Sequence, residues 1–413
     1  MDFDDSPEEA GFRAEARTWL AGAAPPRGES DDTWRRFRAK TEVEDLAFLA
    51  EAKAFQHRLV DAGWAGVHWP VEHGGQGRSA QLAGIFEQER GRFDVPGNFF
   101  MVGIDMAGPT LMAHGSADQQ AKYLRPMLRG DEVWCQLFSE PGSGSDLASL
   151  ATRAERDGDT WVVNGQKVWT SSAHLADRGI LLARTDPDAP KHAGITYFVV
   201  DMKARGVEVR PLRQIDGAIH FNEVFLTDVH IPDADVIGPV GEGWKVALTT
   251  LTAERSAIGG GGHTGYDEVL ALARETGRTD DLTVRQELAR LRTRTEIQRW
   301  LVYRTRTALA RGVQPGPEAS VLKLLNNHQV AHVGDLVMAL LGAGATLSGD
   351  DAARAGSGRT CSSTSGAAAS AAAPSRSSAT SWPSGCSVSP ASPTRSAGNR
   401  GERSPVANPP NWG

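Results

Sequence analysis

One stretch, from Trp134 to Asp146, limits what this chain can fold into more than any other. It reads Trp-Cys-Gln-Leu-Phe-Ser-Glu-Pro-Gly-Ser-Gly-Ser-Asp, so an apolar run changes abruptly into glycine, serine and proline. Because proline lacks a backbone donor and glycine favours turns, the second half cannot continue as a helix or a regular strand. Its N–H groups and its hydroxyls at Ser139, Ser143 and Ser145 could wrap a polar, phosphate-bearing ligand, although an ordinary surface turn has the same composition.

The segment from Trp161 to Trp169 adds a second pattern. It reads Trp-Val-Val-Asn-Gly-Gln-Lys-Val-Trp, in which Asn164-Gly165 separates two short strand-like runs. This dipeptide between such runs predicts a β-hairpin that turns at Asn164-Gly165. Three hydroxyl residues, Thr170-Ser171-Ser172, follow the second tryptophan directly.

Several short motifs follow one another in a fixed order. They are Ser139-Glu140-Pro141, Gly144-Ser145-Asp146, Asn164-Gly165 and Lys167-Val168-Trp169-Thr170-Ser171. In order and spacing they match the flavin-binding signature of the acyl-CoA dehydrogenase family, which the chain resembles over residues 5 to 350. A series of motifs is more specific than a lone glycine motif, so the resemblance predicts a flavoenzyme.

The periodicity of apolar residues predicts an α+β fold. Helical spacing predicts helices at Phe12–Leu20, Leu46–Leu59, Gln81–Arg92, Phe99–His114 and Gln119–Leu128. Alternating or apolar runs predict strands at Gly179–Arg184, Ile195–Met202, Val207–Leu212 and His220–Ile231. Helical spacing returns at Trp244–Ile258, Leu282–Arg311 and Glu318–Leu341. We therefore expect an N-terminal helical domain (1–130), a central antiparallel β domain (131–240) and a C-terminal helical bundle (241–352), which is the arrangement of the resembled family.

Composition excludes several classes of function. The net charge is −7 without a basic stripe, which argues against nucleic acid as a partner. From the acidic residues 1–5 we expect no signal peptide, and no apolar run approaches the ~18 residues of a membrane span. Three cysteines without metal-type spacing indicate a reduced, cytoplasmic compartment. His328 and His332 are spaced for one helix face, but without an accompanying acidic motif we expect them to be structural and expect no metal.

The resemblance implies that a proton leaves Cα and a hydride leaves Cβ of an acyl-CoA thioester, giving a trans-2-enoyl-CoA. A carboxylate must abstract the α-proton, and hydrogen-bond donors must hold the thioester oxygen. Family members carry this acid either in a C-terminal motif or on the helix after the β domain, immediately before an arginine. Glu254 matches the second position and is our candidate for the catalytic base, with a surface glutamate paired to arginine as the alternative. Arg255 resembles the arginine that helps to bind CoA.

The resemblance also implies FAD as the cofactor and assigns residues to it. Phe138 and Ser139 are expected at the pyrimidine edge of the flavin ring, partly through their backbone. Trp169 is expected to cover one ring face, and Ser171 to reach near N5. Each of these could instead be an ordinary turn or core residue.

Two further candidates concern the rest of the cofactor and the assembly. Ser145 matches a hydroxyl near the phosphates and is a candidate for binding both cofactor and substrate. Arg278 resembles an arginine that reaches the FAD of a neighbouring subunit, but Thr279 stands where a phenylalanine usually follows. Family members are usually dimers or tetramers and pass electrons to an electron-transfer flavoprotein, so we expect a homodimer, a homotetramer or a heteromer with a related subunit.

Residues 353 to 413 have a different composition. Of these 61 residues, fifteen are serine and seven are proline, and six arginines face one acid, Glu402. The segment shows no hydrophobic period. One interpretation is a disordered tail.

We favour a second interpretation of this segment, in which the gene is out of frame. With GC-rich codons, Thr364–Pro393 read from the third base of each codon permits LGRRRIRGGTEQIQRDILAERVLGLPREP. This run resembles the C-terminal motif of the family, including its GGT-x-x-IQR core. Glycine then stands where some members carry the base, which agrees with Glu254 in that role.

Two other classes of function remain open at this stage. The chain could keep the fold and use oxygen, as related oxidases do. It could also be a non-catalytic subunit or a degraded gene product, because the C-terminal motif supplies a donor to the thioester oxygen in the resembled family. On that ground we expect the chain as written to bind FAD weakly and to be poorly active.

Overall fold

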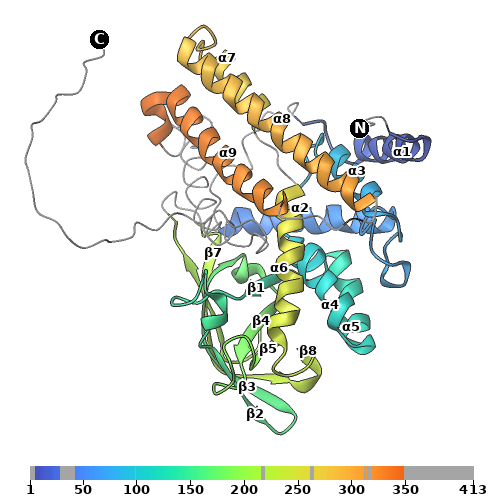
Figure 1. Ribbon diagram of the computed structural model, residues 1–413, viewed down its shortest axis with the longest axis vertical. Helices are drawn as coiled ribbons and strands as arrows, with labels where there is room; N and C mark the ends of the chain where they lie inside the picture. The colour runs from blue at the N-terminus through green and yellow to red at the C-terminus, as the bar shows by residue number, and fades with distance from the viewer. Residues whose placement is uncertain are drawn as a thin grey trace, which may run out of the picture.

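The computed structural model describes residues 5–27, 42–97, 99–214, 219–260, 265–310, 313 and 318–347. In this part of the chain, helices extend to Arg129, strands run from Trp134 to Ile237, and helices return from Gly243 to Leu341 (Figure 1). The predicted α+β class with its order of helices, sheet and helices is confirmed. The Ser/Pro-rich tail and its reading frame concern residues outside those described.

The helices before the sheet follow the apolar spacing of the sequence. They are α1 (Pro7–Ala23), α2 (Glu42–Asp61), α3 (Ala80–Arg90), α4 (Gly108–His114) and α5 (Ala117–Arg129), with the short helices η2 (Val71–His73) and η3 (Val102–Ala107). Ser6 and Ser116 begin α1 and α5 with capping boxes, in which each hydroxyl accepts from the third helical N–H. Where a single helix was predicted over 99–114, the π-helix η3 precedes α4, because Pro109 has no N–H to continue the ladder.

The described strands form one eight-stranded sheet. They are β1 (Trp134–Leu137), β2 (Arg153–Asp157), β3 (Thr160–Ser171), β4 (Arg178–Arg184), β5 (Ile195–Asp201), β6 (Val207–Leu212), β7 (Phe221–Pro232) and β8 (Val236–Ile237). Hydrogen-bonded neighbours follow the order β6-β7-β3-β2-β4-β5-β8, and β1 pairs with β4. Most pairs are antiparallel, as predicted. Two pairs are parallel: β1 with β4, and β2 with β4 at Arg153 and Arg184. The long connection between β1 and β4 permits the parallel pairing.

The hairpin predicted at Asn164-Gly165 is wrong. β3 continues through this dipeptide, and the turn lies at Gly158 between β2 and β3, where φ is +63°. The Asn164 side chain bonds across to Asp228 on β7, donating from Nδ2 to Oδ1 and accepting from the Asp228 N–H, each at 3.0 Å. A Cβ at Gly165 would lie 2.3 Å from the Thr152 hydroxyl, so glycine permits a close strand approach there.

Two apolar cores cover the two faces of the sheet. The first joins the early helices to one face and to α6 (Gly243–Gly260), with Trp69, Tyr197 and Val246 among its members. The second lies on the other face around Trp161 and Phe198. Because the first core crosses residues 130 and 240, the sheet and the helices are packed as one body. The domain limits at 130, 240 and 352 therefore stay predictions.

The last helices have a core of their own. α7 (Tyr266–Glu275), α8 (Leu282–Ala310) and α9 (Glu318–Leu341) pack together through residues that include Leu272, Leu291 and Val337. In Figure 1, α7 lies at the end of the molecule opposite the sheet, and α6 runs between the two. Although α8 and α9 are long, no helix in the described ranges is both long and apolar enough to cross a membrane.

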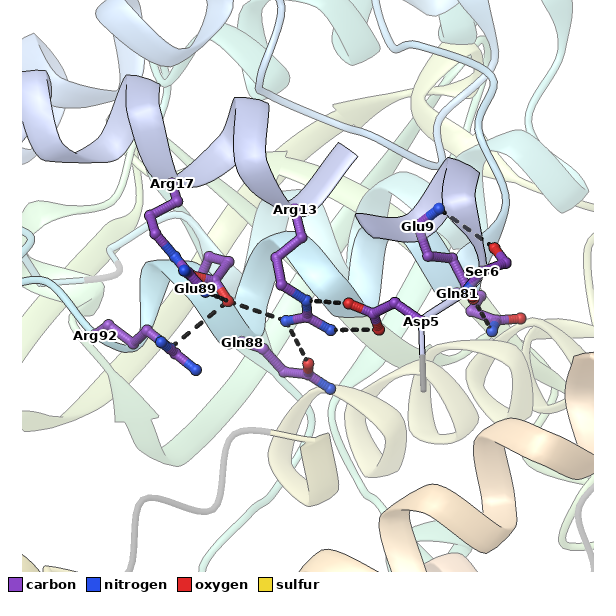
Figure 2. Close-up of polar contacts among 9 residues, drawn as sticks. All are labelled: Asp5, Ser6, Glu9, Arg13, Arg17, Gln81, Gln88, Glu89 and Arg92. Atoms are coloured by element: carbon purple, nitrogen blue, oxygen red, sulfur yellow. Dashed lines mark hydrogen bonds and ion pairs between the residues drawn. The ribbon is translucent and has the colours of Figure 1, made fainter. Parts of the chain in front are cut away.

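A buried carboxylate joins α1 to α3. Glu89, with a side chain that is 0% exposed, accepts from Arg13 Nη1 at 2.9 Å and from Arg17 Nε at 2.8 Å (Figure 2). Arg13 also donates to Asp5, and Arg92 Nε lies 3.6 Å from Glu89. Burial opposes ionisation of Glu89, but the hydrogen bonds from the arginines outweigh it and hold its pKa below the usual range. The ionised cluster therefore connects two helices that are distant in sequence.

Candidate functional site

The loop after β1 is a compact turn. Glu140 N–H donates to the Ser143 carbonyl at 2.8 Å, and Ser143 N–H donates back to the Glu140 carbonyl at 3.0 Å. The Ser143 hydroxyl then donates to the Asp146 carbonyl at 2.7 Å. Pro141 and Gly142 form the tip of the turn. The composition that prevents a regular strand here therefore allows a tight turn, which these hydrogen bonds close.

A buried ion pair connects this loop to β3. Lys167 Nζ donates to Glu140 Oε1 at 2.8 Å and to the Phe138 carbonyl at 3.2 Å, and the two side chains are 0% and 8% exposed. Glu140 also accepts from the N–H groups of Ala151, at 2.7 Å, and Thr152, at 2.9 Å. The carboxylate therefore fixes both ends of the loop.

Each member of this pair favours the charged form of the other, against the effect of burial on both pKa values. Burial lowers the pKa of Lys167 to about 8, although the charge of Glu140 works in the opposite direction. Burial also opposes ionisation of Glu140, but the charge of Lys167 and hydrogen bonds from Lys167 and Thr152 hold the Glu140 pKa below its usual range.

A bulge in β3 turns Trp169 outward. The pairing of β3 with β7 shifts register between Lys167 and Thr170, and Trp169 has φ +61°. Its indole is 63% exposed and meets the Phe221 ring edge-on at 6.0 Å. A positive φ at a residue with a bulky side chain costs free energy of folding, and so does exposing a large aromatic ring to water. Positions that keep such strain are typically functional.

The structure brings four of the predicted flavin residues to one place. Val168 N–H donates to the Ser139 carbonyl at 2.9 Å, so the loop after β1 lies beside the Trp169 segment of β3. Phe138 is buried, with its ring edge-on to Tyr197 at 6.0 Å. Ser171 is half-buried two residues beyond Trp169.

Two buried polar atoms beside Trp169 lack partners among the described residues. They are the Thr170 hydroxyl and His174 Nε2. His174 Nδ1 contacts Asn222 Oδ1 at 3.2 Å, and Asn222 Nδ2 donates to the Thr170 carbonyl at 3.0 Å. An exposed flat ring next to unpaired polar atoms fits a large aromatic ligand with polar edges, such as a flavin.

Ser145 lies on an exposed part of the same loop. Its neighbour Asp146 accepts from the Ser149 hydroxyl at 2.7 Å and pairs with Lys191. The hydroxyl of Ser145 is thus open to solvent at the rim of the signature loop, where it could contact an extended ligand.

Glu254 lies half-buried on α6, one turn after Thr250. The Thr250 hydroxyl is buried and contacts the hydroxyls of Thr110, at 2.8 Å, and Tyr197, at 3.1 Å. Tyr197 lies on β5 and its ring also meets Phe138, so this turn of α6 is connected to Phe138 through one side chain. The side chain of Arg255 lies outside the described part of the structure.

Arg278 is not brought to these residues within the chain. It lies in the connection between α7 and α8, and its Nη2 donates to Asp281 at 2.7 Å. α7 lies at the end of the molecule opposite the sheet (Figure 1). In the described ranges, no group of three histidine, cysteine or acidic residues could hold a metal. His332 instead contacts Glu287, at 2.7 Å, and Arg294, at 3.2 Å.

Sequence reasoning did not find the Lys167–Glu140 pair, His174 or Asn222. Glu140 and Lys167 were noticed only as parts of motifs. No local spacing links a lysine to a glutamate on a different element, so the pair becomes visible only when β3 is placed beside the loop.

Comparisons with known proteins place this arrangement in one family. Family models match three successive parts of the chain: the acyl-CoA dehydrogenase N-terminal domain at residues 6–131, the middle domain at 135–229 and the C-terminal domain at 241–358. Acyl-CoA dehydrogenase IpdE1 of Mycobacterium tuberculosis is 41% identical over 341 residues, which are 80% of this chain and 85% of that protein. The chain belongs to the acyl-CoA dehydrogenase family.

Solved structures agree with this assignment. The Tcur3481-Tcur3483 steroid ACAD superposes with a TM-score of 0.75 at 32% identity, covering 89% of this chain and 94% of that one. The ChsE4-ChsE5 complex from Mycobacterium tuberculosis gives 0.72 at 27% identity, covering 92% and 97%. The protein is therefore an oxidoreductase that acts on CH–CH groups.

Proposed function

We propose that this chain binds FAD and removes two hydrogens from Cα and Cβ of an acyl-CoA thioester, giving a trans-2-enoyl-CoA. The observation that carries the proposal is the outward-turned indole of Trp169, held by a positive-φ bulge beside Ser171 and the Phe138–Ser139 loop. FAD would supply the acceptor for the hydride. The residues of the chain would bind the flavin, orient the thioester against it and accept the α-proton.

The residues around the bulge have distinct roles in this proposal. Phe138 and Ser139 would hold the pyrimidine edge of the flavin, Trp169 would cover one ring face, and Ser171 would donate near N5. Ser145, at the exposed rim, would contact the phosphates and the CoA part of the substrate. The unpaired buried polar atoms beside Trp169 support this assignment, because a bound flavin has polar groups to offer them.

Glu254 is the proposed base that accepts the α-proton. It is half-buried on α6, and the contact of the Thr250 hydroxyl one turn earlier with Tyr197 of β5 supports this role, because it holds α6 against the sheet. Arg255 would follow it as a ligand for CoA. Glu254→Gln should lower kcat by about 10²–10⁴, the usual contribution of a general base, and leave FAD content unchanged.

The first experiment measures FAD content and acyl-CoA oxidation in the purified protein, its Glu254→Gln variant and a Glu268→Gln control. Glu268 lies on α7, away from the sheet. The proposal predicts that all three samples take up added FAD and turn yellow, and that turnover, which is low in the purified protein, falls much further only for Glu254→Gln. Colourless protein that takes up no added FAD would overturn it, and unchanged turnover of Glu254→Gln would remove Glu254 as the base.

The tail bears on how active this chain is. If residues from Thr364 are out of frame, the chain lacks the motif that supplies a backbone donor to the thioester oxygen, and such a loss costs on the order of 10²–10³ in rate. We propose that the chain as written is poorly active and binds FAD weakly, whereas the restored frame is fully active. Sequencing the DNA across codons 345 to 400 and assaying both versions would decide this, and full activity of the 413-residue chain would contradict it.

The electron acceptor and the acyl group form a finer part of the proposal. We propose an electron-transfer flavoprotein as the acceptor, and peroxide release in air would instead indicate an oxidase. The name of the similar steroid ACAD favours a bulky acyl group on the substrate. Turnover of steroid-type acyl-CoA esters compared with straight-chain esters would test this preference.

Assembly is the last part of the proposal. Arg278 follows α7, which lies at the end of the molecule opposite the sheet, and this supports a contact with the FAD of a neighbouring subunit (Figure 1). We propose a homodimer, a homotetramer or a heteromer with a related subunit, in a cytoplasmic, reducing compartment in which the buried Cys135 remains a free thiol. Mass measurement of the purified protein, alone and with a co-expressed related subunit, would distinguish these assemblies.

A further inference from the structure

The contacts of Lys167 point to a function beyond stability. Lys167 lies on β3, two residues before the outward-turned Trp169, and its ammonium reaches both the Glu140 carboxylate and the Phe138 carbonyl. Phe138 is one of the residues assigned to the flavin, and Trp169, another, lies two residues after Lys167. A change at Lys167 is thus transmitted to both sides of the proposed site.

The register of β3 against β7 places a bulge between Lys167 and Thr170. Lys167 faces Val224 of β7 and Thr170 faces Asn222, so three steps on β3 correspond to two on β7. The extra residue turns Trp169 out while Lys167 points inward. At the far side of the bulge, Asn222 donates to the Thr170 carbonyl at 3.0 Å. The bulge is therefore anchored by Lys167 before Trp169 and by Asn222 after it.

Glu140 provides the matching anchor in the loop. Its two oxygens accept from Lys167 and from the N–H groups of Ala151 and Thr152, which begin the approach to β2. The loop from residue 138 to residue 152 is closed at its base by one carboxylate. Since both charges are buried and hydrogen-bonded to each other, the pair defines one arrangement of loop and strand rather than adding much net stability.

We propose that the Lys167–Glu140 pair is a positioning device for the flavin, which sets the distance between the Phe138–Ser139 loop and Trp169. This inference rests on the proposed binding of FAD at these residues. Neither Lys167 nor Glu140 needs to touch the cofactor, because each acts through a backbone group or a neighbour in sequence. A buried charge pair of this kind favours one geometry over the alternatives that an apolar contact would permit.

The test measures FAD affinity and folding separately in the full chain. FAD is titrated into the apoprotein while flavin fluorescence and the flavin absorption spectrum are recorded, and Tm is measured on the same samples. The variants are Lys167→Met, Glu140→Gln and the double variant Lys167→Met/Glu140→Gln. Lys203→Met is the control, because the Lys203 side chain is 74% exposed and pairs with Asp177 beside the ends of β5 and β4.

Lys167→Met should raise the Kd for FAD about tenfold or more, since the loss of one hydrogen bond to the Phe138 carbonyl and of the pair loosens the loop. The double variant should recover part of the lost Tm, because it leaves no buried charge unpaired, but it should not recover FAD affinity. Its flavin spectrum should move towards that of free FAD. Lys203→Met should match the wild type in both measurements.

Two results would overturn the inference. The first is a Lys167→Met protein with lowered Tm but with FAD affinity and flavin spectrum unchanged, which would make the pair purely structural. The second is a double variant in which affinity and Tm recover together, which would mean that the unpaired charge alone caused the loss. Absence of FAD binding in the wild type is a different outcome, which removes the proposed function and the inference with it.

Discussion

The molecule buries two ionised glutamates in quite different ways. Glu89 is 0% exposed between α1 and α3, and its partners reach solvent, with Arg17 49% and Arg92 61% exposed (Figure 2). Glu140 is 8% exposed beside the signature loop, and its partner Lys167 is 0% exposed. The two sites thus differ less in the burial of the carboxylate than in the exposure of the cations, since even Arg13, the most buried arginine of the cluster, is 20% exposed.

This difference separates two uses of a buried charge. Arginines that are partly hydrated can rearrange when Glu89 changes, so that cluster mainly holds two helices together. The ammonium group of the fully buried Lys167 is not hydrated, so its charge is stabilised mainly by the Glu140 carboxylate. The pair therefore favours one local geometry. The same chemistry serves stability in the N-terminal helices and, by our inference, the cofactor site in the sheet.

The largest effect on stability is expected at the enclosed pair. Lys167→Met leaves Glu140 buried without its cation, which should cost about 3–5 kcal/mol of the free energy of unfolding. Urea denaturation followed by far-UV circular dichroism measures this value. A loss below about 1 kcal/mol would show that Glu140 is hydrated in solution and would remove the contrast with Glu89.

A smaller effect is expected at the helix cluster. Glu89→Gln removes the acceptor of two charged hydrogen bonds but leaves arginines that can turn to solvent, so we expect a loss of about 1–3 kcal/mol. FAD affinity and turnover should remain those of the wild type. If Glu89→Gln lowered FAD affinity as strongly as Lys167→Met does, the division of roles between the two sites would fail.

Acid should reveal the Glu89 contribution directly. Its pKa is lower in the folded chain than its usual value of 4.5, so the unfolded state binds more protons as pH falls. The stabilisation is fully present above about pH 4.5 and is lost as pH decreases through the folded-state pKa. Free energies of unfolding measured from pH 7 to pH 3 should fall less steeply for Glu89→Gln than for the wild type, and equal slopes would contradict this.

The smallest effect is expected at the rim of the helix cluster. Arg92 is 61% exposed and its Nε lies 3.6 Å from Glu89, so Arg92→Met should change the free energy of unfolding by less than about 1 kcal/mol. Denaturation at low and high salt measures the difference. A larger loss would mean that Glu89 needs all of its arginines, which would make the cluster as dependent on its partners as the enclosed pair.

Much of the fold could be predicted from local pattern. The predicted helix at Leu282–Arg311 is α8 (Leu282–Ala310), and the predicted strand at Val207–Leu212 is β6 with the same limits. Long periodic segments carry this information because their apolar faces repeat with the period of the element. The prediction at Asn164-Gly165 was wrong because the preference of this dipeptide for a turn is local, whereas the hydrogen bonds of Asn164 with Asp228 come from a strand distant in sequence.

In the candidate site, too, some features could be predicted from local sequence and others depend on tertiary contacts. The sequence by itself determined the family and the order of its elements, and it singled out Phe138, Ser139 and Trp169 as motif residues. It could do so because these motifs are short and each is read from neighbouring residues. It could not determine which way Trp169 faces, since strict alternation from Lys167 would turn both side chains to the same side. Only the register with β7 inserts the extra residue that exposes the indole, and only the placement of the loop beside β3 joins Lys167 to Glu140. Both depend on contacts between segments far apart in the chain, which no local pattern encodes.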